Sequence, residues 1–253
     1  MLVISSLFLA MGGATTRIWR GERAAARGGV AKPTRPPLYL GVMTQNDLFA
    51  DQPAPPQPLP FADYAWPADP PAAGRIVIVG EAPGAEEARL GRPFVGRSGK
   101  LLDETLAAAG IDRSRCLVAN VFRLQPPGNK VGHFFASKAR AKREGLALDE
   151  RWGAFGTSDR LLAAYSGELA ALAEGLARFA PAAIIALGRT PTWALTGENR
   201  ITEARGQRFL CRLGGAAPVI PTYHPSFILR GQYGLIPQWR ADLEQARDIA
   251  AAA

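Results

Sequence analysis

Cysteine and histidine are scarce in this chain, which has two of each among its 253 residues. Cys116 and Cys211 provide no disulfide framework and no Cys-x-x-Cys pair. Each lies in a strand-like run, where cysteine is typically a small core residue. With His133 and His224 as the only imidazoles, the sequence predicts no bound metal, neither a zinc nor an iron–sulfur site.

Further absences narrow the class of protein. No apolar run is as long as a transmembrane helix. Neither Gly-x-x-x-x-Gly-Lys-Ser/Thr nor Gly-x-Gly-x-x-Gly opens a helix, which argues against an unrelated nucleotide-binding α/β enzyme. Residues 1–14 are apolar but lack the basic start of a signal peptide, and a true start at Met11 or Met43 explains them equally well. We therefore expect a cytoplasmic protein.

Basic residues outnumber acidic ones, 30 to 22, which gives a formal net charge of +8 and a pI near 10.0. Such a balance favours a polyanionic partner, nucleic acid first and an acidic membrane surface second. Solubility, or a base composition that favours arginine codons, would also explain it. The apolar fraction of 47% is sufficient for a sizeable core.

Proline is concentrated in residues 52–73, and residues 1–42 are rich in Arg, Gly and Ala without periodicity. We expect residues 1–73 to be a poorly ordered, proline-rich arm and residues 74–253 to form the globular domain. Three aromatic residues are candidates for anchoring the arm to the domain surface: Phe61, Tyr64 and Trp66.

Strand-like and helical patterns alternate along the domain. Strands are predicted near 75–80, 116–121, 182–187, 207–212 and 217–222, and helices near 98–109, 159–179, 189–196 and 237–252. Continuous apolar strands that alternate with helices are typical of a parallel sheet covered on both faces. The predicted fold is a three-layer α/β/α sandwich around a mainly parallel four-stranded sheet.

One connection, residues 122–158, is unusually long for a compact domain, and such connections are often functional or mobile. Its middle, 135–147, could form a helix. The connection carries a basic stretch that includes Lys130, Lys138, Arg140 and Arg143. This stretch could be a solvated helix face or a surface that contacts a DNA backbone.

A carboxylate follows the first predicted strand in the loop Gly80-Glu81-Ala82-Pro83-Gly84. Ligands of open α/β sheets bind at the carboxyl ends of the strands, and glycine lets the backbone approach a ligand closely. Glu81 could therefore bind a sugar hydroxyl or a cation, position water, or stabilise a developing positive charge. The alternative is a glutamate that caps the following turn.

Other side chains are predicted at the same edge. Asn120 ends the second strand and could read the edge of a pyrimidine or hold a loop. Phe94 lies in a Gly/Pro-rich loop and could stack on a planar ligand or plug the core. His224 leaves the last strand before Pro225, and a neutral imidazole there could donate to an oxygen that gains negative charge, or simply be a hydrogen-bonded surface residue. The apolar run 227–229 behind it could be a core plug or a wedge inserted between bases.

Together these segments resemble the uracil-DNA glycosylase superfamily, most closely its family 4, over residues 75–248. Four blocks in the family's order carry the resemblance: GEAPG at 80–84 with GRPFVG at 91–96, VANV at 118–121 with PPGN at 126–129, ITEARG at 201–206, and HPSFILR at 224–230. The resemblance implies an enzyme that flips uracil out of DNA, hydrolyses its N-glycosidic bond and leaves an abasic site. It implies uracil-containing DNA, single- or double-stranded, as the partner, no membrane and no cofactor, and a monomer.

The resemblance also implies roles for individual residues. Glu81 would position water or stabilise the sugar cation, and His224 would stabilise O2 of the departing uracil. Phe94 would stack on the base, Asn120 would read its edge, and Ile228 with its neighbours would fill the gap left in the DNA. The substrate would further contact Ala82, Pro83 and Gly84. The DNA-binding residues would be Lys130, Lys138, Arg140, Arg143, Arg205, Ser226, Phe227, Ile228 and Arg230.

The sequence departs from the family pattern at the cysteines. Family 4 proteins typically hold a four-iron cluster on four cysteines, but this chain reads Phe-Arg-Leu-Gln at 122–125, where one of them is expected, and lacks the N-terminal pair. The chain is therefore expected to lack the cluster. The alternative function is a protein that binds uracil in DNA without turnover or traps it covalently through His133, although the flanks of His133 match the covalently attached relatives poorly.

Overall fold

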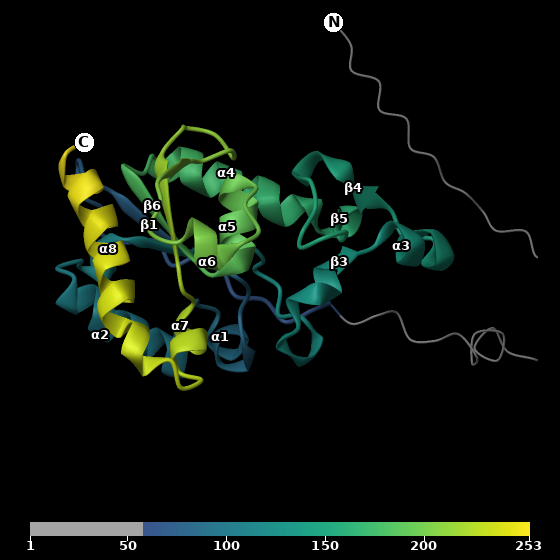
Figure 1. Ribbon diagram of the computed structural model, residues 1–253, viewed down its shortest axis with the longest axis horizontal. Coiled ribbons are helices and arrows are strands. Elements are labelled where there is room, and N and C mark those ends of the chain that lie inside the picture. Colours follow the sequence, from purple (N-terminus) through teal and green to yellow (C-terminus); the bar gives the residue numbers. More distant parts are fainter. Residues whose placement is uncertain (1–57) are drawn as a thin grey trace, which may run out of the picture. The chain divides into compact units, whose positions relative to one another are not determined.

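The computed structural model describes residues 58–253. Its central sheet contains β1 (Ile76–Gly80), β2 (Leu117–Asn120), β6 (Ala183–Leu187), β7 (Phe209–Leu210) and β8 (Pro218–Thr222), in the order β2-β1-β6-β8-β7 (Figure 1). Strands β2, β1, β6 and β8 are parallel, and the edge strand β7 pairs with β8 in the antiparallel direction. The mainly parallel sheet is confirmed, but the predicted count of four strands omits this antiparallel edge strand.

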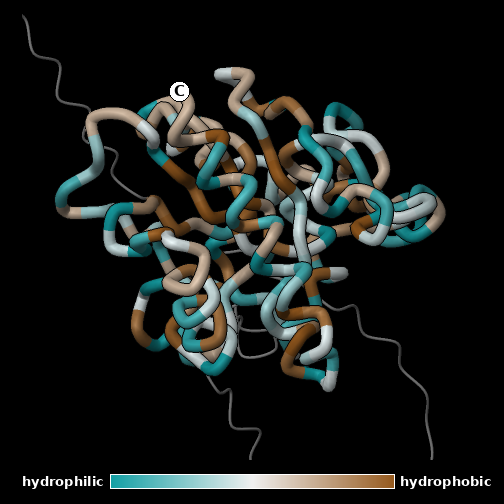
Figure 2. Tube along the Cα trace, turned by 60° about the vertical axis from the view of Figure 1, so that its left-hand side comes forward, coloured by the Kyte–Doolittle hydropathy of each residue, from teal (hydrophilic) through white to brown (hydrophobic). Residues whose placement is uncertain are grey.

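Helices cover both faces of the sheet, because the side chains of each strand point alternately to the two sides. Ile76 and Ile78 of β1 lie in one core cluster with residues of α2 (Arg97–Ala108) and α8 (Ile236–Ala251). Val77 and Val79 lie in the other, with α4 (Ser166–Phe179) and α5 (Arg189–Thr196). Figure 2 shows hydrophobic residues concentrated along the central strands between these layers. The predicted three-layer arrangement is confirmed.

The chain between Asn120 and α4 forms a small unit of its own, here called the insertion (residues 122–165). It contains an antiparallel sheet of β3 (Phe135–Ala136), β5 (Arg160–Leu162) and β4 (Leu148–Asp149), in that order, and the helix α3 (Lys138–Glu144). The predicted helix at 159–179 therefore begins only at Ser166, since β5 occupies its first residues. The helix predicted at 135–147 is shorter, because β3 precedes it.

Aromatic side chains join the insertion to the main core. The rings of Phe122 and Phe134 stack at 4.1 Å, and those of Phe135 and Phe155 at 4.2 Å. Trp193 of α5 meets Phe135 edge-on at 5.2 Å. Because all five are buried, the insertion packs on the domain as a continuation of its core.

Short elements complete the described chain. The remaining α-helices are α1 (Ala85–Leu90), α6 (Ile201–Ala204) and α7 (Pro225–Ile228). The 3₁₀ turns are η1 (Arg113–Arg115), η2 (Pro127–Asn129), η3 (Val131–Phe134), η4 (Glu150–Trp152), η5 (Ala163–Tyr165) and η6 (Tyr233–Leu235). No helix of residues 58–253 combines the length and hydropathy needed to cross a membrane.

The described part of the predicted arm, residues 58–73, runs along the outer edge of β2. Ala65 and Val118 exchange backbone hydrogen bonds of 2.8 and 3.0 Å, and Trp66 contacts the ring of Phe179 edge-on at 6.3 Å. This contact covers a strand edge that would otherwise leave N–H and C=O groups unpaired. Residues 1–57 lie outside the described chain, so the poor order expected for the arm and the boundary at 73/74 stay predictions.

A buried carboxylate ties α8 to the strand that leads to His224. Asp242 is 4% exposed, accepts two hydrogen bonds from the Arg205 guanidinium at 2.7 and 3.1 Å, and accepts a third from Thr222 Oγ1 at 2.6 Å. The bidentate geometry satisfies both oxygens. Arg205 was predicted to bind DNA, and the structure places its guanidinium in this pair.

We predict that Asp242→Ala destabilises the fold, because it leaves Arg205 and Thr222 without their partner. Removing one member of a buried pair typically costs about 3–5 kcal/mol. The measurement is the free energy of unfolding in urea. The matched control on the same helix is Asp248→Ala, whose exposed side chain pairs only with the neighbouring Arg247, and it should change stability by less than about 0.5 kcal/mol. Equal effects of the two substitutions would contradict the prediction.

Candidate active site

A cavity of about 250 Å³ opens at the carboxyl ends of β1, β2 and β8. It contains every residue predicted to act on or bind the substrate. Its lining is Glu81, Ala82, Pro83, Gly84, Glu87, Phe94, Ser98, Asn120, Pro126, Asn129, His224 and Ser226. The strand ends converge here because the sheet is parallel, so loops distant in sequence share one edge.

Gly80 makes room for two of the lining side chains. It pairs in register with Asn120, and a Cβ on Gly80 would lie 2.4 Å from Asn120 Oδ1 and 2.5 Å from Phe94 Cζ. Any larger residue would therefore displace the amide or the ring. A Cβ on Gly99 would lie 1.9 Å from the Phe94 carbonyl oxygen, so this glycine lets α2 approach the Phe94 loop.

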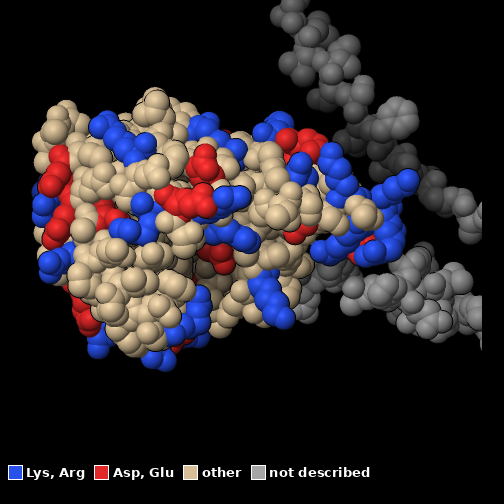
Figure 3. All heavy atoms as spheres, in the orientation of Figure 1, with Lys and Arg blue, Asp and Glu red and all other residues tan. Residues whose placement is uncertain are grey.

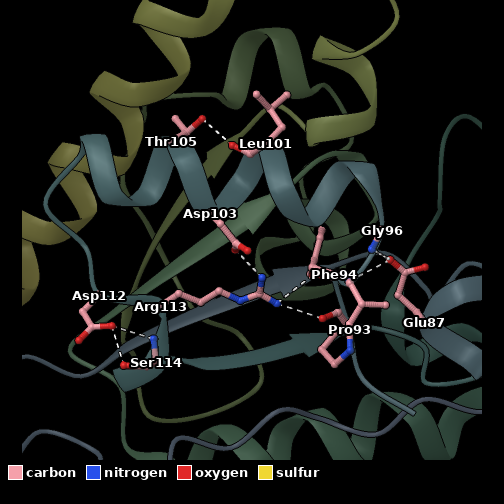
Figure 4. Close-up of polar contacts among 11 residues, drawn as sticks. Glu87, Pro93, Phe94, Gly96, Leu101, Asp103, Thr105, Asp112, Arg113 and Ser114 are labelled. Carbon is pink, nitrogen blue, oxygen red and sulfur yellow. Dashed lines mark hydrogen bonds and ion pairs between the residues drawn. The ribbon is translucent and has the colours of Figure 1, made fainter. Parts of the chain in front are cut away.

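The Phe94 loop is braced from two sides (Figure 4). Phe94 has a positive φ of 53°, which is unusual for a residue with a side chain and needs support from its surroundings. Arg113 supplies part of it, since its Nη2 donates to the carbonyl oxygens of Pro93 and Phe94, both at 3.1 Å. Asp103 pairs with the same guanidinium.

Glu87 supplies the rest of this support. Its Oε1 accepts hydrogen bonds from the backbone N–H groups of Val95 and Gly96, both at 3.2 Å (Figure 4). Its Oε2 accepts one from the backbone N–H of Gly84, also at 3.2 Å. The carboxylate therefore joins the two glycine-rich halves of the loop and closes the first turn of α1. Glu87 also lines the cavity.

Glu81 is held as a partly buried carboxylate. Thr190 Oγ1, on α5, donates a hydrogen bond to Glu81 Oε2. Burial raises the pKa of Glu81 above its ordinary value, and the Thr190 hydrogen bond and the charges of Arg189 and Arg230 oppose that rise. The sequence offered one signal for Thr190: it lies just past Gly188, at the end of β6, the strand that pairs with β1.

His224 is held as a neutral donor. Its Nδ1 accepts the backbone N–H of Ser226 at 3.1 Å and lies 2.8 Å from the Ser226 hydroxyl. An Nδ1 that accepts a backbone N–H carries no proton, so the proton of the neutral ring is on Nε2. Burial and the charge of Arg230 lower the pKa of His224 to about 4. The rings of His224 and Phe94 are 5.8 Å apart.

A second cavity of about 550 Å³ adjoins the first and shares Glu81 and His224 with it. Three residues predicted to bind DNA line it: Ser226, Phe227 and Arg230. Ile228, the last residue of α7, does not line it. Its side chain is fully buried in the core cluster that contains residues of α2 and α8. The predicted gap-filling segment, Ile228 with its neighbours, therefore does not present the Ile228 side chain at the surface. Phe227, half-buried against Tyr223 at 5.3 Å, lies at the surface instead.

The predicted basic residues of the connection lie on the insertion and line neither cavity. Lys138 pairs with Glu150 at 3.1 Å, and Arg140 and Arg143 both pair with Glu144 at 2.9 Å. Figure 3 shows basic side chains gathered around this part of the molecule. The remaining predicted residue, Lys130, is exposed between η2 and η3.

His133 is also outside both cavities. Its Nε2 lies 2.8 Å from the hydroxyl of Tyr165, at the other end of the insertion. The ring is half-buried against Phe134 and Tyr165. This arrangement occupies the ring nitrogen within the insertion and gives it no place beside Glu81.

The residues present do not fit an iron–sulfur cluster. Cys116 and Cys211 are the only cysteines, and they lie in the two different core clusters, on opposite faces of the sheet. Burial raises the pKa of Cys116 to about 12 and also raises that of Cys211, which disfavours the thiolate that metals bind. Within residues 58–253 no group of three or more His, Cys, Asp or Glu side chains is arranged to hold a metal ion.

Comparisons with known proteins agree with this geometry. The family model described as uracil DNA glycosylase superfamily matches residues 67–246. A type-4 uracil-DNA glycosylase of Thermotoga maritima is 36% identical over 169 residues, which cover 62% of this chain and 68% of the relative. One from Pyrobaculum aerophilum is 30% identical over 161 residues, 61% of this chain and 68% of the relative.

We predict that His224 stays neutral until the pH falls to about 4, because its surroundings disfavour the imidazolium. Because the chain has only two histidines, imidazole ¹⁵N NMR can follow each one. In His133→Asn the only remaining imidazole signals are those of His224. The spectrum should show the Nε2–H tautomer. Arg230→Gln should move the titration to higher pH, since it removes a repelling charge. A midpoint at the ordinary value of 6.5 would contradict this account of the site.

Proposed function

This chain belongs to the uracil DNA glycosylase superfamily, and we propose that it hydrolyses the N-glycosidic bond of deoxyuridine in DNA and leaves an abasic site. The observation that carries the proposal is the pairing of an anionic group, Glu81, with a neutral N–H donor, His224, in one cavity. Cleavage of this bond creates positive charge on the sugar and negative charge on the departing base. The two side chains match those two charges.

The proposed mechanism assigns one task to each group. Glu81 stabilises the oxocarbenium-like sugar and positions the attacking water. His224 donates from Nε2 to uracil O2 as negative charge develops there. A donor in place before the reaction costs no reorganisation, and one such donor is typically worth about 3 kcal/mol of transition-state stabilisation. No other group is required to supply charge in this scheme.

The walls of the cavity support a single flipped pyrimidine as the ligand. A volume of about 250 Å³ is just below the roughly 300–1,000 Å³ that is typical of pockets for drug-sized ligands, as suits a ligand as small as one base. Phe94 offers a ring face for stacking, and Asn120 offers both a donor and an acceptor to the base edge. Ala82, Pro83 and Gly84 complete the wall. A base within a duplex cannot reach such a site, so it must be flipped.

DNA then lies across the wider cavity, where Ser226, Phe227 and Arg230 contact it, and the insertion extends the contact through its lysines and arginines. The enzyme acts as a monomer, on single- or double-stranded DNA, in the cytoplasm. Of the side chains near the base gap, Phe227 suits the wedge better than Ile228, because it is not locked in the core. Arg205 supports the site through Asp242 rather than through DNA.

We predict that Glu81→Gln and His224→Ala each lower kcat/KM for uracil excision by about 10²–10³-fold, since each removes the charge or dipole that stabilises the transition state. Both should bind uracil-containing DNA as the unaltered protein does. The measurement is strand cleavage by alkali at abasic sites in an oligonucleotide with one uracil. Arg208→Met, outside both cavities, is the control for an exposed substitution. Equal activity of all four proteins would remove Glu81 and His224 from the mechanism.

The same assay separates excision from the alternative of binding or covalent trapping. Trapping through His133 would give a protein–DNA adduct that survives heat on a denaturing gel, and no alkali-labile site. The hydrogen bond between His133 and Tyr165 favours excision, because it keeps the imidazole within the insertion. An adduct that disappears in His133→Asn would reverse this assignment.

We further predict that replacing Lys138, Arg140 and Arg143 with Gln lowers the affinity for DNA. The same change should make that affinity depend less steeply on salt concentration. Each phosphate contact contributes a slope of about 0.9 to the plot of log affinity against log salt concentration, so three contacts would account for up to about 3. Fluorescence anisotropy over a salt series measures the slope. An unchanged slope would show that these side chains serve their ion pairs within the insertion and do not contact DNA.

A further inference from the structure

Arg189 contacts the insertion and lines the same cavity as Glu81. It is the first residue of α5 and follows Gly188, whose φ of +96° turns the chain out of β6. The Arg189 guanidinium lies 4.2 Å from the centre of the Phe155 ring, within the range of a cation–π contact. Phe155 is a buried residue of the insertion and stacks on Phe135. The direction of Arg189 is thus set by a segment outside the central fold.

The segment that carries Phe155 is itself held by hydrogen bonds to Asn199. Asn199, in the loop after α5, accepts the backbone N–H of Gly156 at 2.7 Å and donates to the carbonyl of Ala154 at 3.0 Å. Phe155 also forms an isolated antiparallel β-bridge with Asp159. The aromatic ring under Arg189 is therefore held by both of its backbone neighbours.

Arg189 and Glu81 line the same 550 Å³ cavity, and the residue after Arg189 is Thr190, which donates to Glu81. The other charged or titratable groups that line these two cavities with Glu81 are Arg230 beyond α7, Tyr223 and His224 after β8, and Glu87 of α1. Arg230 reaches the Ser226 hydroxyl only weakly, at 3.4 Å, and Glu87 is committed to three backbone N–H groups.

We propose that Arg189 is a positioning residue for the reaction: the insertion, through Phe155, holds its guanidinium near Glu81, where it keeps the carboxylate ionised while Thr190 fixes the direction of one oxygen. This inference rests on the proposed function. It gives the insertion a part in the chemistry as well as in DNA contact. Its physical basis is that burial disfavours the charged form of Glu81, and a nearby cation that is itself anchored offsets that penalty.

The test is the pH dependence of kcat/KM for uracil excision, whose acidic limb reports the ionisation of an essential base in the free enzyme. Arg189→Met should move that limb to higher pH, so the loss relative to the unaltered protein grows as the solution becomes more acidic. Arg189→Lys should restore most of the limb, since it keeps the charge. Phe155→Leu should shift the limb in the same direction as Arg189→Met, because it removes the ring but keeps the apolar volume. Arg208→Met, an exposed arginine outside the cavity, should leave the limb unchanged.

A loss that is equal at every pH, together with a smaller salt slope of DNA binding in Arg189→Met, would overturn the proposal and assign Arg189 to a phosphate. An unshifted limb in Arg189→Met would also overturn it. Thermal melting checks that each variant folds, and the two Arg189 variants carry the test if Phe155→Leu does not. Failure of the proposed function looks different: the unaltered protein would then excise no uracil at any pH.

Discussion

The structure of the site depends on keeping one carboxylate charged where water is scarce. Burial raises the pKa of Glu81, so the folded chain holds that proton more tightly than the unfolded chain does. The stability that this proton confers is complete below the ordinary pKa of 4.5 and is lost as pH rises through the raised value. At neutral pH the ionised carboxylate therefore opposes folding. Thr190, Arg189 and Arg230 limit that cost, and all three belong to segments distant in sequence from the loop that carries Glu81.

Arg230 acts on both halves of the site in the direction that the chemistry needs. A positive charge lowers the pKa of every group near it, so it favours the anionic form of Glu81 and the neutral form of His224. His224 has its own linkage to stability. As pH falls from 6.5 to about 4 the unfolded chain takes up the proton first, so the fold loses stability across that window. A single guanidinium thus shifts both titrations to lower pH, which favours the ionised carboxylate and the neutral imidazole together.

The sequence predicted the parts of this site that local patterns encode. The buried strands at 76–80 and 183–187 were recognisable as continuous apolar runs, and Glu81, Asn120 and His224 could be placed at strand ends for that reason. The small sheet of the insertion could not, because strands of two or three residues carry no measurable alternation. The pairing of Arg205 with Asp242 joins residues 37 positions apart, and the burial of Ile228 depends on which side of a one-turn helix meets the core. Those outcomes are decided by packing.

The insertion is anchored beside the groups proposed to act in catalysis at two points. Val121 and Phe122 follow Asn120 directly and are fully buried, and Phe122 stacks on Phe134. Near its other end, Phe155 lies under Arg189. The segment where the family resemblance would place a cysteine is thus packed by aromatic rings. It is also held by a backbone hydrogen bond from Phe122 to Glu81 and by the pairing of Arg123 with Glu168. Loosening those rings would disturb the amide proposed to read the base and the guanidinium near Glu81 together, because both are positioned by the same aromatic core.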